Sequence, residues 1–316
     1  MKAVFIETPG GPENLKYADL PKPVPGPGQA LVKIAASGVN FIDIYFRTGL
    51  YKADPPVVLG NEGAGIVEAV GPDVTEVKPG DRVAYAMARG SYAEYALVPA
   101  WQLVKLPDAV DFKTAAAAML QGMTAHYLTH STFSLRAGQS CLIHAAAGGV
   151  GLLLVQMAKM LGAHVIGTVG DEAKAAQAKA AGADQVIVYT QEDFAPKAQG
   201  MHVVYDSVGK ATFLKSLDCL RPRGMMVTFG NASGAVPDFA PLMLGAKGSL
   251  FLTRPSLAAY TATKEELQWR AGAVLGWIAE GKLKLHIHKV YRLAQAAQAQ
   301  QDLEGRKTTG KLLLIP

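Results

Sequence analysis

The stretch "AAGGVG", residues 146–151, spaces its glycines like a turn that binds phosphate. It fits the pattern G-x-G-x-x-G with Ala146 in place of the first glycine. Gly148 would let the backbone approach a pyrophosphate, and Gly151 would let a helix pack closely on the preceding strand. An ordinary tight turn is the alternative. The expected contacts of a dinucleotide are Ala147, Gly148, Gly149, Val150 and Gly151.

The next apolar run, "AHVIGTVG", lacks the acidic residue that accepts the ribose hydroxyls in NAD enzymes. It ends in Val169 and Gly170, so nothing there would repel a 2′-phosphate. Lys174 falls in the first turn of the next predicted helix, for which Asp171 is the expected N-cap. A cation there opposes the helix dipole unless it meets an anion. We therefore expect NADPH rather than NADH, although Lys174 could be merely solvated and Asp171 could serve the ribose.

Candidate metal ligands are scarce in the sequence. The two cysteines, Cys141 and Cys219, lie far apart in apolar surroundings, which favours buried thiols over a disulfide or a cysteine-rich zinc lobe. Two histidine pairs have no cysteine or carboxylate beside them to complete a ligand set: His126 with His130, and His286 with His288. We therefore expect no metal site.

Size and composition favour a globular enzyme of about two domains. Of the 316 residues, 50% are hydrophobic and 18% are charged. The apolar run at the start of the sequence is too short for a secretory signal. No apolar run approaches the roughly 18 residues of a membrane span. We expect a cytoplasmic protein without membrane contact. The net charge of +5 is spread along the chain and favours anionic ligands, with nucleic acid a less favoured partner.

Two regions that differ in composition and in the pattern of apolar runs indicate two domains, which must position these residues. The first 110 residues are rich in glycine and proline and carry short apolar runs such as "ALVKIAA", typical of a compact, barrel-like β domain. From about residue 112, alanine-rich helical stretches alternate with short β-branched runs, which predicts an α/β doubly wound parallel sheet. A helix is expected to start near Thr263, and the tail should return to the first domain. The predicted domains are residues 1–122 with 264–316, and residues 123–263.

Several longer motifs carry a family resemblance. "SGVNFIDIYFRTGLY", "GNEGAGIVEAVG" and "KPGDRVAY", followed by the glycine turn, resemble the medium-chain dehydrogenase/reductase superfamily over essentially the whole chain. Within it, "HAAAGGVG", "VVYDSVG", "FGNASGAV" and "LTRPSL" are similar to the zeta-crystallin type of quinone oxidoreductase. The resemblance implies a GroES-like β-rich catalytic domain and a Rossmann cofactor domain.

The resemblance also bears on zinc. Alcohol dehydrogenases of this superfamily take zinc through a cysteine in the first motif and a histidine in "GHE", whereas this sequence has Asn40 and Asn61 there. A protein without zinc is expected. A quinone accepts hydride without a strong Lewis acid because the charge spreads into its ring, so orientation and one or two hydrogen bonds are expected to suffice.

Roles for individual residues follow from the same resemblance. Asn40 and Tyr45 would hydrogen-bond the quinone, and Tyr51 would close the mouth of the site; packing alone is the alternative for all three. Lys174 and Tyr189 would hold the 2′-phosphate and the adenosine end. The remaining cofactor contacts would be Ser207, Phe229, Gly230, Ser233, Thr253, Arg254 and Arg306. The apolar run "GSLFLTR" is a poor solvent-facing edge, and the resemblance implies a homodimer joined there.

The sequence thus predicts an NADPH-dependent quinone reductase that transfers hydride without metal. One alternative keeps the cofactor and reduces α,β-unsaturated aldehydes or ketones. A second is a cofactor-modulated RNA-binding or crystallin-like protein, although no stacking motif of aromatic and arginine residues supports it.

Overall fold

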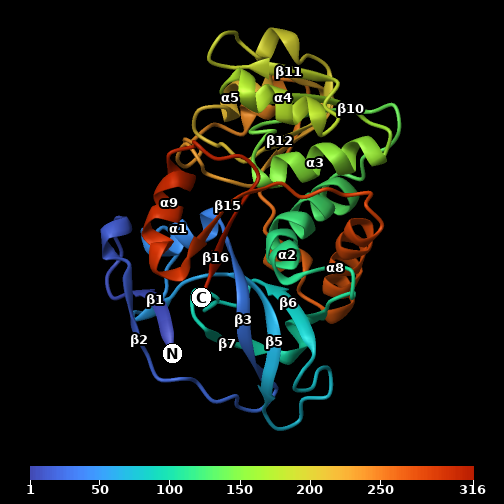
Figure 1. Cartoon of the computed structure of the whole chain (residues 1–316). Coiled ribbons are helices and arrows are strands. Elements are labelled where there is room, and N and C mark those ends of the chain that lie inside the picture. Colours follow the sequence, from blue (N-terminus) through green and yellow to red (C-terminus); the bar gives the residue numbers. More distant parts are fainter. The chain divides into compact units, whose positions relative to one another are not determined.

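The computed structural model describes residues 1–316 and divides them into two compact units (Figure 1). The first unit comprises residues 1–123 and 261–316, and the second comprises residues 124–260. No helix is both long enough and apolar enough to span a membrane.

The first unit is built on two sheets. The larger has the order β15, β16, β3, β5, β6, β8, with β7 also paired to β3, and the smaller has the order β2, β1, β4. Their strands are β1 (Lys2–Ile6), β2 (Lys16–Asp19), β3 (Gln29–Val39), β4 (Val57–Val58), β5 (Glu62–Val70), β6 (Arg82–Ala86), β7 (Tyr95–Pro99), β8 (Val104–Lys105), β15 (Ile287–Arg292) and β16 (Lys311–Ile315). The helices are α1 (Phe41–Arg47), α2 (Phe112–Tyr127, which crosses the boundary between the units), α8 (Lys264–Ala279) and α9 (Ala296–Glu304).

The tail of the chain completes the larger sheet. Strand β16 lies antiparallel to β3, with Leu313 opposite Gly38, and Figure 1 shows both strands side by side. Leu312, Leu313 and Leu314 are buried, so the apolar tail fills part of the core of the unit that begins at residue 1. The structure has the tail in the first unit. The helix start expected near Thr263 is confirmed, since Thr263 caps α8 by accepting from the Glu266 N–H.

The second unit is a six-stranded sheet of the order β11, β10, β9, β12, β13, β14, with every pair parallel. Its strands are β9 (Ser140–Ile143), β10 (His164–Val169), β11 (Gln185–Val188), β12 (Met201–Asp206), β13 (Leu220–Thr228) and β14 (Phe251–Thr253). Its helices are α3 (Gly149–Met160), α4 (Glu172–Ala180), α5 (Phe213–Leu217), α6 (Leu242–Ala246) and α7 (Leu257–Tyr260), and a π-helical turn follows α2 at Leu128–Thr132.

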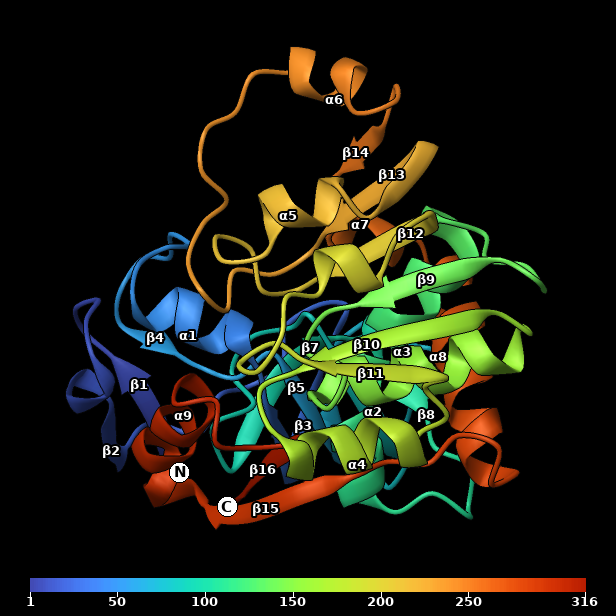
Figure 2. The ribbon, with the colours of Figure 1, turned by 90° about the horizontal axis from the view of Figure 1, so that it is seen from above.

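The order of the strands fixes where this unit can bind a ligand. From β9 the chain proceeds first to β10 on one side and later to β12 on the other, and Figure 2 shows these strands side by side. Such a reversal leaves a crevice at the carboxyl ends of the strands, where ligands of doubly wound sheets bind. The predicted fold class, a β-rich GroES-like domain with a Rossmann-type parallel sheet, is confirmed.

Candidate functional site

The glycine turn lies between β9 and α3 in the second unit. Gly148 is the N-cap of α3, and its N–H donates to the Ala145 carbonyl at 2.8 Å. A Cβ at Gly151 would lie 2.2 Å from that carbonyl oxygen, so only glycine fits there. The close approach brings the first turn of α3 against the end of β9. The N–H groups of that first turn have no partner within the helix and are the donors suited to a pyrophosphate.

Most of the predicted cofactor contacts follow the carboxyl ends of strands in this one sheet. The structure therefore brings them to the same edge, because all six strands are parallel. They are Ala147 to Gly151 after β9, Gly170 after β10, Tyr189 after β11, Ser207 after β12, Phe229, Gly230 and Ser233 after β13, and Thr253 and Arg254 at β14. Arg306 belongs to the first unit, where it follows α9 with φ of 54°.

Strand β10 ends at Val169 without an acidic residue, and Lys174 follows in the first turn of α4. The carboxylate of Asp171 caps α4 by accepting from the Lys174 N–H at 2.9 Å, as the sequence predicted. That backbone hydrogen bond is the main reason why the pKa of Asp171 lies below its usual value. Lys174 Nζ stands 3.4 Å from the same carboxylate. A Cβ at Gly170 would lie 3.0 Å from the Tyr189 hydroxyl, so Tyr189 lies against the residue that directly precedes the N-cap of α4.

The loops after β12 and β13 hold each other. A Cβ at Gly230 would lie 2.4 Å from the Ser207 carbonyl oxygen. The Ser233 hydroxyl donates to the Val208 carbonyl and accepts from the Ala211 N–H. Arg254 donates to the Gly230 carbonyl at 3.0 Å. These bonds shape the edge of the site, so Ser233 and Arg254 support the loops whether or not they also touch a ligand.

The three predicted catalytic residues lie on or beside α1 in the first unit. Asn40 is the N-cap of α1 and is 5% exposed. Tyr45 is half-buried on α1, and its ring packs edge-on to that of Tyr51 with centroids 5.3 Å apart. The backbone joins them too, since the Tyr51 N–H donates to the Tyr45 carbonyl at 3.0 Å. Tyr45 and Tyr51 therefore form one partly exposed aromatic surface, while Asn40 points into a buried cluster.

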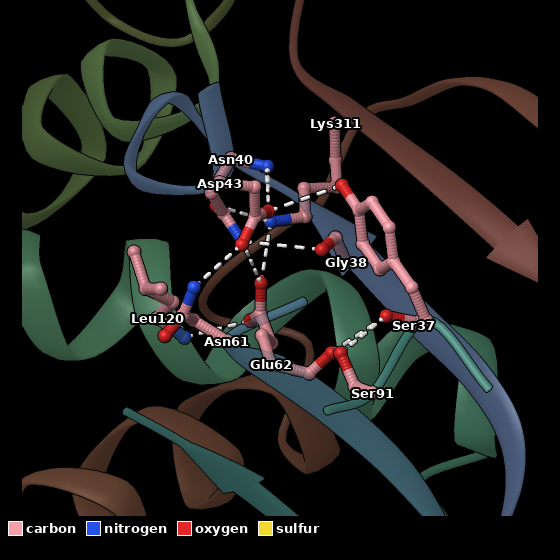
Figure 3. Close-up of polar contacts among 10 residues, drawn as sticks. Ser37, Gly38, Asn40, Asp43, Asn61, Glu62, Ser91, Leu120 and Lys311 are labelled. Atoms are coloured by element: carbon pink, nitrogen blue, oxygen red, sulfur yellow. Dashed lines mark hydrogen bonds and ion pairs between the residues drawn. The ribbon is translucent and has the colours of Figure 1, made fainter. Parts of the chain in front are cut away.

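That cluster, the amide network, joins Asn40 to a buried ion pair (Figure 3). Lys311 Nζ lies 2.5 Å from Glu62 Oε2, and both side chains are 1% exposed or less. Lys311 also donates to Asn40 Oδ1 at 2.7 Å, and Asn40 Nδ2 donates to Glu62 Oε2 at 2.8 Å. The second amide hydrogen of Asn40 faces the Gly38 carbonyl over a longer 3.3 Å. The other Glu62 oxygen accepts from the Leu120 N–H of α2, so residues of three elements, β16, α1 and α2, hold this one carboxylate of β5.

Asp43 extends the network on the same side of α1. Its carboxylate accepts from Asn61 Nδ2 at 2.7 Å, from the Asn40 N–H at 2.9 Å and from the Tyr92 hydroxyl at 3.1 Å. Burial raises the pKa of Asp43 to about 6, and these hydrogen bonds and the Lys311 charge only partly oppose the rise. Asp43 is therefore held as a structural acceptor, and its ionisation falls near neutral pH.

Sequence reasoning missed Glu62 and Lys311. Glu62 stands in the quoted "GNEG" motif, and Lys311 opens the apolar strand "KLLLI". A charge at the start of a buried strand was a usable signal, since lysine is rarely buried without a partner. Its partner could not be inferred, because 249 positions of sequence separate Lys311 from Glu62.

Known proteins resemble the chain over its whole length. The family model described as alcohol dehydrogenase GroES-like domain matches residues 26–108, and the one described as zinc-binding dehydrogenase matches residues 181–314. A quinone oxidoreductase of Pseudomonas aeruginosa is 48% identical, with 100% of this chain and 99% of that protein covered. The chain belongs to the quinone oxidoreductase family.

Solved structures agree with this assignment. The crystal structure of an Escherichia coli quinone oxidoreductase complexed with NADPH matches with a TM-score of 0.98 at 44% identity, covering 100% of both chains. Among relatives found by sequence, a 2-haloacrylate reductase of Burkholderia sp is 42% identical, with 99% of this chain and 98% of that protein covered.

The zinc in the name of the second family model does not fit this site. Amide nitrogens have no lone pair to give a metal, and the oxygen of Asn40 faces the ammonium group of Lys311, whose charge would repel a cation. Asn61 uses its amide to donate to Asp43. Nowhere in residues 1–316 do three or more His, Cys, Asp or Glu side chains gather closely enough to hold a metal ion.

Proposed function

We propose that this protein reduces quinones with NADPH and needs no metal. The observation that carries the proposal is the amide network, which occupies the positions of two zinc ligands of the related alcohol dehydrogenases with Asn40 and Asn61. A reaction served by hydrogen bonds rather than a Lewis acid suits a quinone, whose reduced form is a modest base. Relatives named quinone oxidoreductase at 44% to 48% identity support the same reaction.

NADPH would be held by the second unit. The first turn of α3 would donate N–H groups to the pyrophosphate, and Lys174 with Tyr189 would hold the 2′-phosphate beside Gly170. The loops at Ser207, Phe229, Gly230, Ser233, Thr253 and Arg254 would line the rest of the binding site. NADPH would supply the hydride, and the crystal structure of the E. coli quinone oxidoreductase complexed with NADPH supports that choice of cofactor.

The first unit would bind the quinone. Tyr45 and Tyr51 offer an aromatic surface for stacking, and the Tyr45 hydroxyl is a donor for a quinone oxygen. Asn40 would donate the amide hydrogen that now faces Gly38, because that bond is the longer of its two. Glu62 and Lys311 would keep the Asn40 amide in place during the reaction.

We also propose that the chain forms a homodimer through β14. This edge strand has only three residues, and its Phe251 is 57% exposed. Leu242 of the neighbouring helix α6 is 82% exposed. Pairing would cover an apolar edge that is otherwise open to aggregation. Sedimentation of the wild type and of Phe251→Lys tests this: a dimer that becomes a monomer supports it, and a wild-type monomer contradicts it.

The cofactor assignment is tested by the rate of NADPH or NADH oxidation with 1,4-benzoquinone. We expect the wild type to prefer NADPH and Lys174→Ala to lose about tenfold in kcat/KM for NADPH, with little change for NADH. Lys179→Ala is the matched control, because Lys179 lies in the last turn of the same helix. Equal loss with both cofactors, or a wild type that prefers NADH, would contradict the phosphate role.

The similarity to a 2-haloacrylate reductase favours a second candidate, the reduction of α,β-unsaturated carbonyl compounds. The same site would serve it, since hydride would arrive at the β-carbon and the carbonyl oxygen would take the place of the quinone oxygen. Direct competition between 1,4-benzoquinone and an enone separates the two candidates. A higher kcat/KM for the enone than for the quinone would favour the second candidate over quinone reduction.

A further inference from the structure

His144 forms a buried hydrogen-bonded chain beneath the glycine turn. It directly follows β9, is 1% exposed, and uses both ring nitrogens. Nδ1 lies 2.8 Å from the Thr168 hydroxyl, and Nε2 lies 2.8 Å from the Ser216 hydroxyl. The Ser216 hydroxyl gives its own hydrogen to the Thr212 carbonyl. Ser216 must therefore accept from an Nε2–H, and the hydroxyl of Thr168 must donate to an unprotonated Nδ1, which fixes one neutral tautomer.

The next residue along the chain has an unusual backbone conformation. Ala145 has φ of 52°, in the left-handed region that residues with a Cβ disfavour. It is one position ahead of the alanine that replaces glycine in the sequence motif. Its carbonyl accepts from the Gly148 N–H and lies against Gly151, so the conformation of Ala145 sets the path of the whole turn.

Thr168 holds the residues on both sides of Ala145. Its side chain donates to His144, and its backbone carbonyl accepts from the Ala146 N–H at 3.0 Å. His144 is also tied to β12, since its N–H donates to the Tyr205 carbonyl at 3.0 Å. Ala145 is thus flanked by two anchored neighbours, which is the arrangement that keeps a disfavoured backbone conformation populated.

We propose that His144 is a positioning residue for the cofactor: with Thr168 and Ser216 it holds Ala145 in the left-handed conformation and so aligns the turn and the first N–H groups of α3 for a pyrophosphate. The inference rests on the proposed function, in which this turn binds NADPH. His144 contributes no proton, because both ring nitrogens are engaged with hydroxyl groups inside the unit.

The test is a fluorescence titration of NADPH into the full chain without quinone, which measures binding and not turnover. His144→Ala is expected to raise the dissociation constant about tenfold, since loss of the clamp lets Ala145 leave the disfavoured conformation. Thr168→Val removes the hydroxyl but keeps the backbone bond, and it should weaken binding in the same direction. His202→Ala is the matched control: His202 accepts from the Ser140 N–H at the opposite end of β9, and NADPH affinity should not change.

A rescue variant separates positioning from general damage. Glycine adopts positive φ without strain, so adding Ala145→Gly to His144→Ala or to Thr168→Val should recover most of the lost affinity. Ala145→Gly alone should bind within about twofold of the wild type.

Each outcome decides one question. If the wild type binds NADPH and both single variants bind it equally well, the inference is wrong and the proposed function stands. Folded single variants with weak binding that Ala145→Gly does not rescue overturn the positioning role as well. If His144→Ala does not fold, the Thr168→Val pair gives the answer. If the wild type binds no NADPH, the proposed function itself is contradicted.

Discussion

The two units solve the burial of polar groups in opposite ways. In the first unit, the amide network buries charges: Lys311 and Glu62 form an ion pair, and Asp43 adds a second carboxylate. In the second unit, His144 is buried among hydroxyl groups without a charged partner in direct contact. Burial favours the neutral form in both places, since it raises the pKa of Asp43 to about 6 and lowers the pKa of His144. Because burial favours the neutral form of both the acid and the base, their contributions to the free energy of unfolding must change with pH in opposite directions.

The largest expected effect breaks the charged network. Lys311→Met leaves the Glu62 carboxylate buried without its cation and should lower the free energy of unfolding by about 3–5 kcal/mol. The exposed pair Lys16 and Glu7 has the same 2.5 Å separation and serves as control. Lys16→Met should cost no more than about 1 kcal/mol. Urea denaturation of the three proteins measures both values.

Restoring neutrality sharpens that result. The double variant Lys311→Met with Glu62→Gln removes both charges and should recover part of the stability lost in Lys311→Met. If Lys311→Met loses no more free energy of unfolding than Lys16→Met, Lys311 and Glu62 do not form the buried ion pair of the structure.

A smaller effect isolates Asp43. Its pKa is raised on folding from an ordinary value of 3.8 to about 6, so its stabilising contribution is present at low pH and is lost as pH rises through about 6. Between pH 4.5 and 8 this loss amounts to about 2 kcal/mol. Asp43→Asn removes the titrating group. The difference in free energy of unfolding between wild type and variant, measured at both pH values, should shift by that amount; no shift would mean that Asp43 titrates normally.

The smallest effect has the opposite sign. The pKa of His144 is lowered from 6.5 by burial, so the unfolded chain takes up a proton first as pH falls. Its contribution is present at pH 8 and declines as pH falls through about 6.5, by less than about 1 kcal/mol at pH 6. His144→Gln, which cannot titrate, should lack this decline in urea denaturation. A decline of the same size in His144→Gln would assign it to other groups.

The contrast also marks how far sequence reasoning reaches. The six parallel strands, the turn and the cap at Asp171 follow from local signals: short β-branched runs, glycine spacing and an acidic residue before a helix. The predicted cofactor residues of the second unit share one edge because they follow strands that all run parallel. Local patterns predict these features because each of them depends on residues that lie close together in the sequence.

Other features depend on contacts that no local pattern reveals. Asn40 and Lys311 lie 271 positions apart, so the ammonium group that holds the Asn40 amide was invisible in the sequence. The left-handed Ala145 carries no signal either, because alanine there looks like a continuation of the strand. Where a residue is buried, charged or strained, its partner must be found in three dimensions.

The most direct test of the account is turnover of NADPH with 1,4-benzoquinone by protein stripped of metal with a chelator, before and after added zinc. The amide network predicts full turnover in the stripped protein and no stimulation by zinc. Turnover that appears only when zinc is added would show that Asn40 and Asn61 do not replace the metal ligands, and the proposed chemistry would be wrong.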